Sequence, residues 1–241
     1  MNIALDHARR KEPHVTMLNL QVLGTGEKLP FAPHRLFVAG YAGRDLQAVE
    51  AHIAELASIG VPRPATIPAF YQLAPELLTT DATVSVTGPA TSGEVEPVIL
   101  RRDGDYYLTV GSDHTDRDLE RSSIDDSKAA CPKPIAPTAV RLGTDLASTS
   151  WEEMTVASTV DGDPYQAGAV STLRHPADLF ERLAGAIGQV TGDFALFCGT
   201  VPLLEPEFVF GTAWTVRLGL PDGCELTHGY EVWVDAEPVS V

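Results

Sequence analysis

The most informative stretch of this 241-residue chain opens with Gly93-Glu94-Val95-Glu96-Pro97-Val98-Ile99-Leu100. It reads as an apolar strand with two carboxylates at its start. Because alternate side chains of a strand share one face, Glu94 and Glu96 are expected to converge while Val95 and Ile99 face the other way. Two like charges are unfavourable to bury together unless a cation neutralises them, and a hard divalent ion is the simplest such cation. The stretch therefore predicts a strand that presents a metal site.

Two later segments supply further polar groups. A second apparent strand, Tyr106–Val110, leads into Gly111-Ser112-Asp113-His114-Thr115-Asp116-Arg117-Asp118, where Asp113 is a candidate third ligand. Ser127-Lys128 follows soon after. A Glu-x-Glu pattern alone is common on solvent-facing strand positions. The presence of these polar segments within one short span is what favours a metal site.

In their order and content these segments resemble the fumarylacetoacetate hydrolase superfamily. Its members carry a Glu-x-Glu, then an Asn-Asp-x-Ser-Ala-Arg-Asp motif, then a Gly-Lys-Ser or similar Lys-Ser segment. The resemblance implies that Glu94, Glu96 and Asp113 ligate Mg²⁺ or Mn²⁺. It also implies that Arg117 and Lys128 are cations that anchor the substrate.

A helix is predicted upstream, capped by Asp45 and ended by Gly60. Its apolar stripe comprises Leu46, Val49, Ile53 and Leu56. His52 and Glu55 are three residues apart and therefore neighbours on the helix, which by spacing alone indicates a surface pair. Smaller members of the superfamily carry a His-x-x-Glu dyad on a short lid helix. The resemblance thus implies a lid over residues 41–60, in which Glu55 orients His52 as a general base for water.

Two more segments resemble substrate-contacting parts of the family. Gly199-Thr200-Val201-Pro202 is similar to a Thr-Gly-Thr-Pro turn whose threonine contacts substrate, which implies that role for Thr200. Gln72 stands where the family has a Phe-x-Lys segment, which implies a substrate-binding position.

The chain also departs from the family pattern. Asp116 replaces a small residue and adds negative charge beside the metal, and Glu120 stands near the place of a substrate-binding Gln. Gln72 replaces a Lys, which is expected to weaken affinity for a second anionic group. The connection between Glu96 and Asp113 is shorter than in typical members. The chain is therefore expected to form a divergent branch with its own substrate.

Composition narrows the class of protein. With 44% hydrophobic residues, the chain can form one domain over residues 1–241, with residues 1–35 as an N-terminal strand elaboration. A formal charge of −16 argues against a nucleic-acid partner. No apolar run approaches about 18 residues and no signal peptide is evident, so no membrane partner is expected. The three cysteines, Cys131, Cys198 and Cys224, are widely spaced, which predicts neither disulfides nor a zinc site and favours the cytoplasm.

β-type segments outnumber helices, so the fold class is expected to be α+β and rich in strands. The predicted strands are Val15–Leu23, Leu36–Ala39, Thr83–Thr87, Pro97–Leu100, Tyr106–Val110, Phe194–Cys198, Phe208–Leu218 and Tyr230–Val234. A second helix is predicted after His175-Pro176, with Leu179, Leu183 and Ile187 on one stripe. The resemblance implies a mixed β-roll like the catalytic C-terminal domain of fumarylacetoacetate hydrolase, assembled as a homodimer.

The favoured function is a divalent-metal-dependent hydrolase. It would cleave a carbon–carbon bond next to a carbonyl in a small oxo-acid, such as an acylpyruvate or a β-diketo acid. His52 would activate water, Lys128 would stabilise the developing oxyanion and Arg117 would grip the carboxylate. A decarboxylase, hydratase or tautomerase acting on similar acids is the alternative within the enzyme class. A non-catalytic binding module with the same fold is the alternative outside it.

Overall fold

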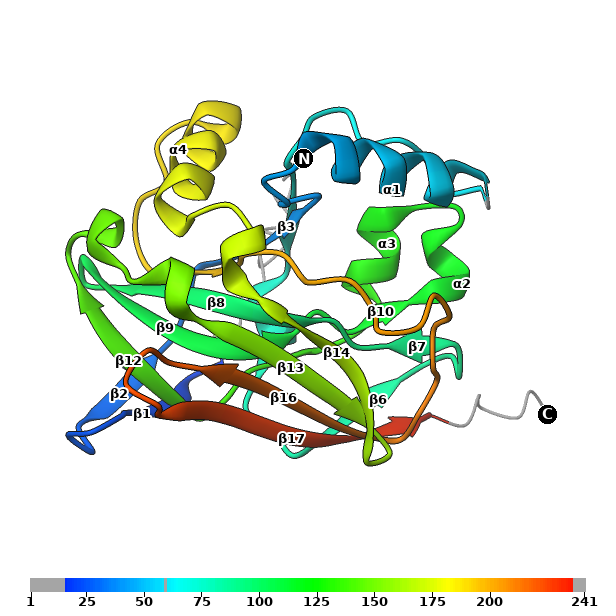
Figure 1. The fold of residues 1–241 in the computed structure, drawn as a ribbon. Helices are drawn as coiled ribbons and strands as arrows, with labels where there is room; N and C mark the ends of the chain where they lie inside the picture. The colour runs from blue at the N-terminus through cyan, green and yellow to red at the C-terminus, as the bar shows by residue number, and fades with distance from the viewer. Residues whose placement is uncertain (1–15, 59, 236–241) are drawn as a thin grey trace, which may run out of the picture.

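Two β-sheets dominate a computed structural model of the chain, which describes residues 16–58 and 60–235 (Figure 1). The larger sheet has eight strands in the order β2 (Lys28–Phe31), β1 (Leu18–Val22), β12 (Thr138–Gly143), β9 (Asp105–Ser112), β8 (Val95–Arg102), β15 (Phe194–Phe197), β3 (Arg35–Gly40) and β4 (Ala69–Leu73). The smaller sheet has five strands in the order β14 (Asp163–Ala169), β13 (Thr155–Val160), β16 (Ala213–Gly219), β17 (Glu225–Val234) and β6 (Thr83–Val86).

Short elements complete the architecture. Two small ladders pair β10 (Thr115–Asp116) with β7 (Thr91–Ser92) and β11 (Lys133–Pro134) with β5 (Leu78–Thr79). The α-helices are α1 (Leu46–Ser58), α2 (Arg117–Glu120), α3 (Ile124–Ala129) and α4 (Pro176–Ile187). Single 3₁₀ turns lie at Pro75–Leu77, Leu146–Ser148, Trp151–Glu153 and Val170–Thr172.

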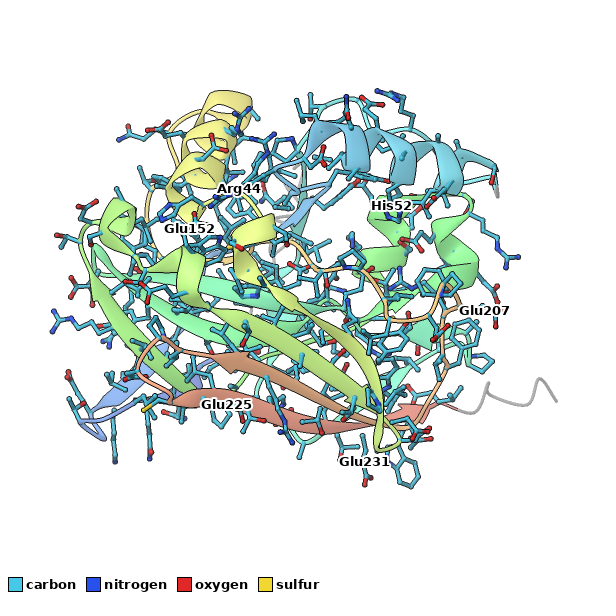
Figure 2. All side chains as sticks on the ribbon, in the orientation of Figure 1. Arg44, His52, Glu152, Glu207, Glu225 and Glu231 are labelled. Carbon is cyan, nitrogen blue, oxygen red and sulfur yellow. The ribbon has the colours of Figure 1, made fainter. Side chains whose placement is uncertain are left out.

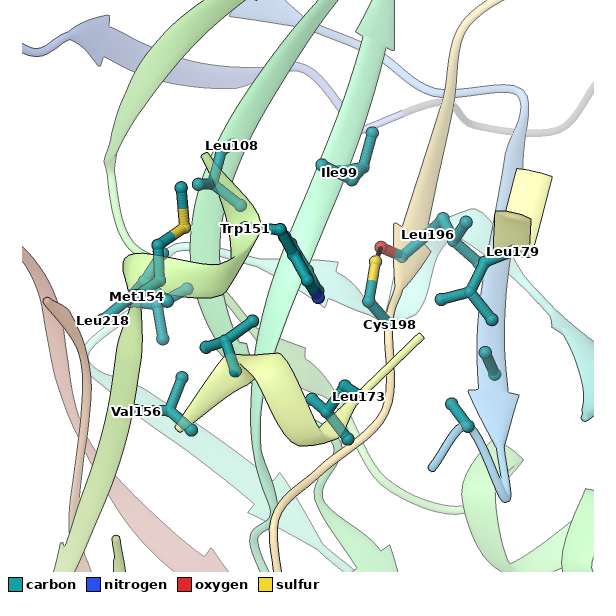
Figure 3. Packing of buried hydrophobic residues seen from close by; sticks show 14 of the residues in the cluster. Ile99, Leu108, Trp151, Met154, Val156, Leu173, Leu179, Leu196, Cys198 and Leu218 are labelled. Carbon is teal, nitrogen blue, oxygen red and sulfur yellow. Dashed lines mark hydrogen bonds between the residues drawn. The ribbon is translucent and has the colours of Figure 1, made fainter. Parts of the chain in front are cut away.

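The main core lies between the two sheets and is closed at one side by α4. Trp151, which is fully buried, lies near its centre (Figure 3). The larger sheet contributes Ile99 and Leu108, the smaller sheet Leu218, and α4 Leu179. Removing this much apolar surface from water is the main force that holds the sheets together.

The larger sheet is buried on both faces. Leu36, Val98 and Leu100 belong to a second cluster on the face away from the main core, together with Phe31 of β2. Every residue from Val95 to Leu100 is buried, which explains why this segment reads as an almost continuous apolar run. The N-terminal strands β1 and β2 extend this sheet at one edge.

Local sequence signals correctly predict where helices α1 and α4 begin. Asp45 caps α1, since its Oδ1 accepts hydrogen bonds from the N–H groups of Gln47 (2.8 Å) and Ala48 (3.2 Å). Pro176 occupies the first turn of α4, as its missing N–H allows. Helices α1, α2 and α3 gather at one end of the molecule (Figure 1). Among the helices of residues 16–58 and 60–235, none has the length and apolarity that crossing a membrane requires.

The strand-rich, mixed fold predicted from the sequence is confirmed. Two strands were predicted too long. Within the described part of Val15–Leu23 only Leu18–Val22 is strand, and β16 begins at Ala213, whereas Phe208 to Thr212 form a loop. Its apolar side chains have another role, because Phe208 packs on the guanidinium of Arg117. Helices α2 and α3 were not predicted, because both are too short to show a periodic apolar stripe. Residue 15, at the start of the first predicted strand, lies outside the described residues.

Candidate metal centre

The antiparallel hairpin of β8 and β9 brings the three predicted ligands together. Val95 pairs with Ser112 in this ladder, so Glu94 lies opposite Asp113, whose N–H donates to the Glu94 carbonyl at 2.9 Å. Glu96 follows two residues along β8, on the same side of the strand. One carboxylate oxygen from each of Glu94, Glu96 and Asp113 lies within 4.8 Å of the others.

Burial makes it unfavourable for all three carboxylates of this cluster to be ionised. Glu96 and Asp113 are buried, while Glu94 is half-buried. Burial, reinforced by the Asp113 carboxylate, raises the pKa of Glu96 well above its usual range. Glu96 Oε2 also accepts a hydrogen bond from the Gly199 N–H at 2.7 Å. Gly199 has φ 94°, and a Cβ there would lie 2.6 Å from that of Ala42, so only glycine suits this turn.

Two buried lysines share the Asp113 carboxylate. The Lys128 ammonium, from α3, contacts Asp113 Oδ2 and lies 3.9 Å from Glu94 Oε2. The Lys133 ammonium lies 3.1 Å from Asp113 Oδ1 and donates to the carbonyls of His114 (2.5 Å) and Lys128 (2.6 Å). Although burial opposes ionisation, the two lysines lower the pKa of Asp113 to about 2. The sequence analysis did not single out Lys133; a lysine between Pro132 and Pro134 was the available signal.

Arg117, at the start of α2, is held by groups of the chain itself. Its Nε donates to Ser92 Oγ at 2.7 Å, and its Nη1 donates to Glu120 Oε2 at 2.9 Å. Its Nη2 lies 3.2 Å from Glu94 Oε1. The Phe208 ring covers the guanidinium, with 4.2 Å from Cζ to the ring centroid. The structure thus brings Arg117 to the cluster, with Glu120 as its ion-pair partner.

His114 lies beside the cluster but supports the fold. Its Nδ1 is 3.0 Å from the Tyr230 hydroxyl and its Nε2 is 2.9 Å from Thr91 Oγ1. Burial, with Lys133 and Arg117 nearby, lowers the pKa of His114 to about 3, so the imidazole is neutral. Both ring nitrogens are engaged, which leaves neither for a ligand.

Thr200 and Gln166 fix the beginning of β8. The Thr200 hydroxyl donates to the Val95 carbonyl at 2.8 Å. The buried Gln166 amide accepts from the Val95 N–H (2.9 Å) and from Ser158 Oγ (3.1 Å), and it donates to Thr200 Oγ1 (2.8 Å) and the Val201 carbonyl (2.7 Å). One side chain therefore ties three segments to the strand that carries Glu96.

Gln166→Leu is expected to lower the free energy of unfolding by about 1–3 kcal/mol, because the buried Val95 N–H and its neighbours lose their partner. Chemical denaturation measures this value. The matched control is Gln72→Leu at an exposed position. Its free energy of unfolding is expected to stay within about 0.5 kcal/mol of the wild-type value. Equal losses in the two variants would show that the Gln166 network is not important for stability.

Two tyrosines that the sequence analysis did not select lie at the site. The Tyr71 ring centroid is 5.7 Å from Lys128 Nζ. Burial raises the pKa of Tyr41, and the negative charge of Glu120 raises it further. Burial likewise raises the pKa of Tyr71. Gln72 does not join the cluster, because it alternates with Tyr71 on β4, is exposed, and its Oε1 accepts from Arg35 Nη2 at 2.8 Å.

The His52–Glu55 pair lies on α1, with 3.7 Å between His52 Nδ1 and Glu55 Oε2. Both side chains are exposed, at 60% and 78%. Figure 2 shows His52 on the side of α1 that faces α3. Its ring centroid is 6.4 Å from that of Tyr41, so one aromatic ring connects the pair to the cluster.

The donor set fits a hard divalent cation. Three carboxylates supply an all-oxygen set of the kind that Mg²⁺ and Mn²⁺ accept. Within residues 16–58 and 60–235, Asp113 Oδ1 is a buried oxygen that has no partner of hydrogen-bond geometry. A cation would neutralise the like charges of Glu94, Glu96 and Asp113, at the expense of the proton that burial favours on Glu96.

A family model described as "Protein of unknown function (DUF2848)" matches residues 39–230, most of the chain. The chain belongs to the DUF2848 family. The matched residues include the three carboxylates of the cluster, both lysines and the helix that carries His52. A search of curated proteins found no match to this DUF2848 chain.

Solved structures share the fold of this DUF2848 protein at low sequence identity. A protein from Oleispira antarctica, described as a candidate fumarylacetoacetate isomerase/hydrolase, aligns with TM-score 0.62 and 17% identity over 89% of this chain and 99% of its own. A 5-carboxymethyl-2-hydroxymuconate delta-isomerase from Mycobacterium smegmatis aligns with TM-score 0.58 and 15% identity over 88% and 87%.

A third structure is a 2-keto-3-deoxy-D-arabinonate dehydratase complexed with magnesium and 2,5-dioxopentanoate. It aligns with TM-score 0.56 and 14% identity over 84% of this chain and 74% of its own. These alignments confirm the predicted fold: the DUF2848 chain has the architecture of fumarylacetoacetate hydrolase-like proteins.

Proposed function

We propose that the protein is a divalent-metal-dependent hydrolase that cleaves a carbon–carbon bond next to a carbonyl in a small oxo-acid of the acylpyruvate or β-diketo acid type. The observation that carries the proposal is the convergence of Glu94, Glu96 and Asp113 beside the buried Lys128. A structural cation site has no use for an adjacent ammonium group, whereas a site that stabilises developing negative charge can use one.

The residues of the chain have separate roles in this proposal. Glu94, Glu96 and Asp113 would hold Mg²⁺ or Mn²⁺, which supplies Lewis-acid polarisation of a chelated 2-oxo-carboxylate. Lys128, beside the three carboxylates, would stabilise the oxygen on which negative charge develops. Attraction from Asp113 and Glu94 outweighs burial and raises the pKa of Lys128 above its usual range, so it stays charged. His52, oriented by Glu55, would take the proton of the attacking water.

The test combines metal analysis with a screen of oxo-acids. Calorimetry is expected to show one Mg²⁺ or Mn²⁺ per chain, and the mass of the products is expected to show addition of water with cleavage into two fragments. Release of carbon dioxide would indicate a decarboxylase instead, and an unchanged product mass a tautomerase. Metal and oxo-acid binding without turnover would identify a binding module.

Lys128→Met is expected to lower kcat by about 10²-fold or more, the scale seen when a donor to a developing oxyanion is removed. Metal binding should persist, because the three carboxylates remain. Steady-state kinetics on a cleaved substrate measure the effect, and Lys28→Met, at an exposed position of β2, is the control. A Lys128→Met enzyme with normal kcat would remove this lysine from the proposed mechanism.

A further inference from the structure

Glu120 changes what Arg117 can recognise. Both Glu120 oxygens lie within hydrogen-bond distance of Arg117 Nη1, at 3.1 and 2.9 Å, and both side chains are buried. The negative charge of Glu120 therefore cancels the positive charge that would attract a carboxylate. Arg117 Nη2 lies 3.2 Å from Glu94 Oε1, so a second carboxylate of the chain also faces the buried guanidinium.

The charges of the whole cluster lead to the same conclusion. Four carboxylates face three cations: Glu94, Glu96, Asp113 and Glu120 against Arg117, Lys128 and Lys133. With all four carboxylates ionised the net charge is −1, and a bound divalent cation changes it to +1. One substrate carboxylate then brings the net charge of the site to zero. A second carboxylate would leave an uncompensated negative charge in a buried site.

The side chains that surround Arg117 and Lys128 include aromatic rings, which are suited to contact an apolar group of a substrate. Phe208 covers the guanidinium, and its loop runs past α2, as the position of Glu207 in Figure 2 shows. Tyr41 and Tyr71 lie near Lys128, and burial keeps both phenols protonated. Asp116 is not paired with the cations of the cluster among the described residues; its Oδ1 caps α2 by accepting from the N–H groups of Asp118 and Leu119.

We propose that Glu120 makes this site select an oxo-acid whose far end is uncharged, an acyl or hydroxyl group with an apolar tail, and reject one that carries a second carboxylate. The proposal rests on the oxo-acid function proposed above. Glu120 acts here as a specificity-determining residue through its ion pair with Arg117, whereas the metal ligands bind the part that all such acids share.

The test is calorimetry on the Mg²⁺-loaded protein with 2-oxoglutarate and 2-oxohexanoate, which differ in whether the far end is a carboxylate or an alkyl group. The wild type is expected to bind 2-oxohexanoate about tenfold or more tightly than 2-oxoglutarate, since an unpaired buried charge costs at least that much. In Glu120→Gln, affinity for 2-oxoglutarate is expected to rise about tenfold while that for 2-oxohexanoate changes little.

The matched control is Glu152→Gln, which breaks the exposed ion pair with Arg44 and should leave the preference unchanged. Thermal unfolding and Mg²⁺ titration show whether Glu120→Gln is intact, and the wild-type preference tests the proposal even if this variant fails to fold. If the wild type binds 2-oxoglutarate as tightly as 2-oxohexanoate or more tightly, or if folded Glu120→Gln keeps the wild-type preference for 2-oxohexanoate, the selectivity role of Glu120 is overturned. Either result leaves the proposed oxo-acid function standing. If neither acid binds the metal-loaded protein, the oxo-acid function fails and the selectivity proposal fails with it.

Discussion

Glu96→Gln is expected to weaken Mg²⁺ binding by at least about 100-fold, beyond the 10- to 100-fold effects of residues that only support metal ligands. Catalytic activity should be lost with it. The reason is the ligand set: affinity for a hard cation depends on the number of charged oxygens, and this site has three carboxylates. Isothermal calorimetry of the purified variant measures the change.

Glu96→Gln is a conservative test because it keeps the hydrogen bond of the turn. An amide oxygen can accept from the Gly199 N–H as Glu96 Oε2 does at 2.7 Å. The neutral amide also resembles the protonated carboxyl group that burial and Asp113 favour at Glu96, so the fold should not weaken. Glu225→Gln, at an exposed position of β17 on the smaller sheet, is the control. Unchanged Mg²⁺ affinity in Glu96→Gln would refute the metal centre.

The sequence predicted the metal ligands because their spacing is a property of one hairpin. Two carboxylates in a Glu-x-Glu pattern and a third just after the next strand are brought together by antiparallel pairing alone. Lys133 and Gln166 could not be found in this way. The contacts of Lys133 depend on how a proline-rich segment packs against the end of β9, and those of Gln166 on how the β13–β14 hairpin packs against β8, which local patterns do not encode.

Similar reasoning explains the fold predictions. The buried strand β15 was recognised because it is apolar throughout, and β8 because it contains the apolar run Pro97–Leu100; α4 was recognised because proline marks its first turn. The Phe208 segment was mistaken for a strand because aromatic residues are typical of strands, whereas here the aromatic ring packs on a buried arginine. Of the predicted α1 stripe, Val49 and Ile53 are buried but Leu46 is 55% exposed, so this helix covers less apolar surface than its sequence suggested.

His52→Gln is expected to lower kcat by about 10² to 10⁴-fold, the range for loss of a general base. The low-pH limb of the pH–rate profile, where activity falls because the base becomes protonated, should also disappear. His52 is exposed on the side of α1 that faces α3 (Figure 2), and its ring centroid lies 6.4 Å from that of Tyr41. The proposal therefore requires residues 41–60 to act as a lid that brings His52 to the substrate, excluding bulk water at the same time.

The matched control is His34→Gln, a substitution at an exposed histidine away from α1. Glu55→Gln should give an intermediate loss, because it removes the group that orients His52 but leaves the base in place. Mg²⁺ affinity should be unchanged in all three variants, which separates the dyad from the metal ligands. If His52→Gln keeps the turnover and the pH–rate profile of the parent enzyme, His52 and Glu55 form only a surface ion pair, and the base must be sought among the groups closer to Glu94.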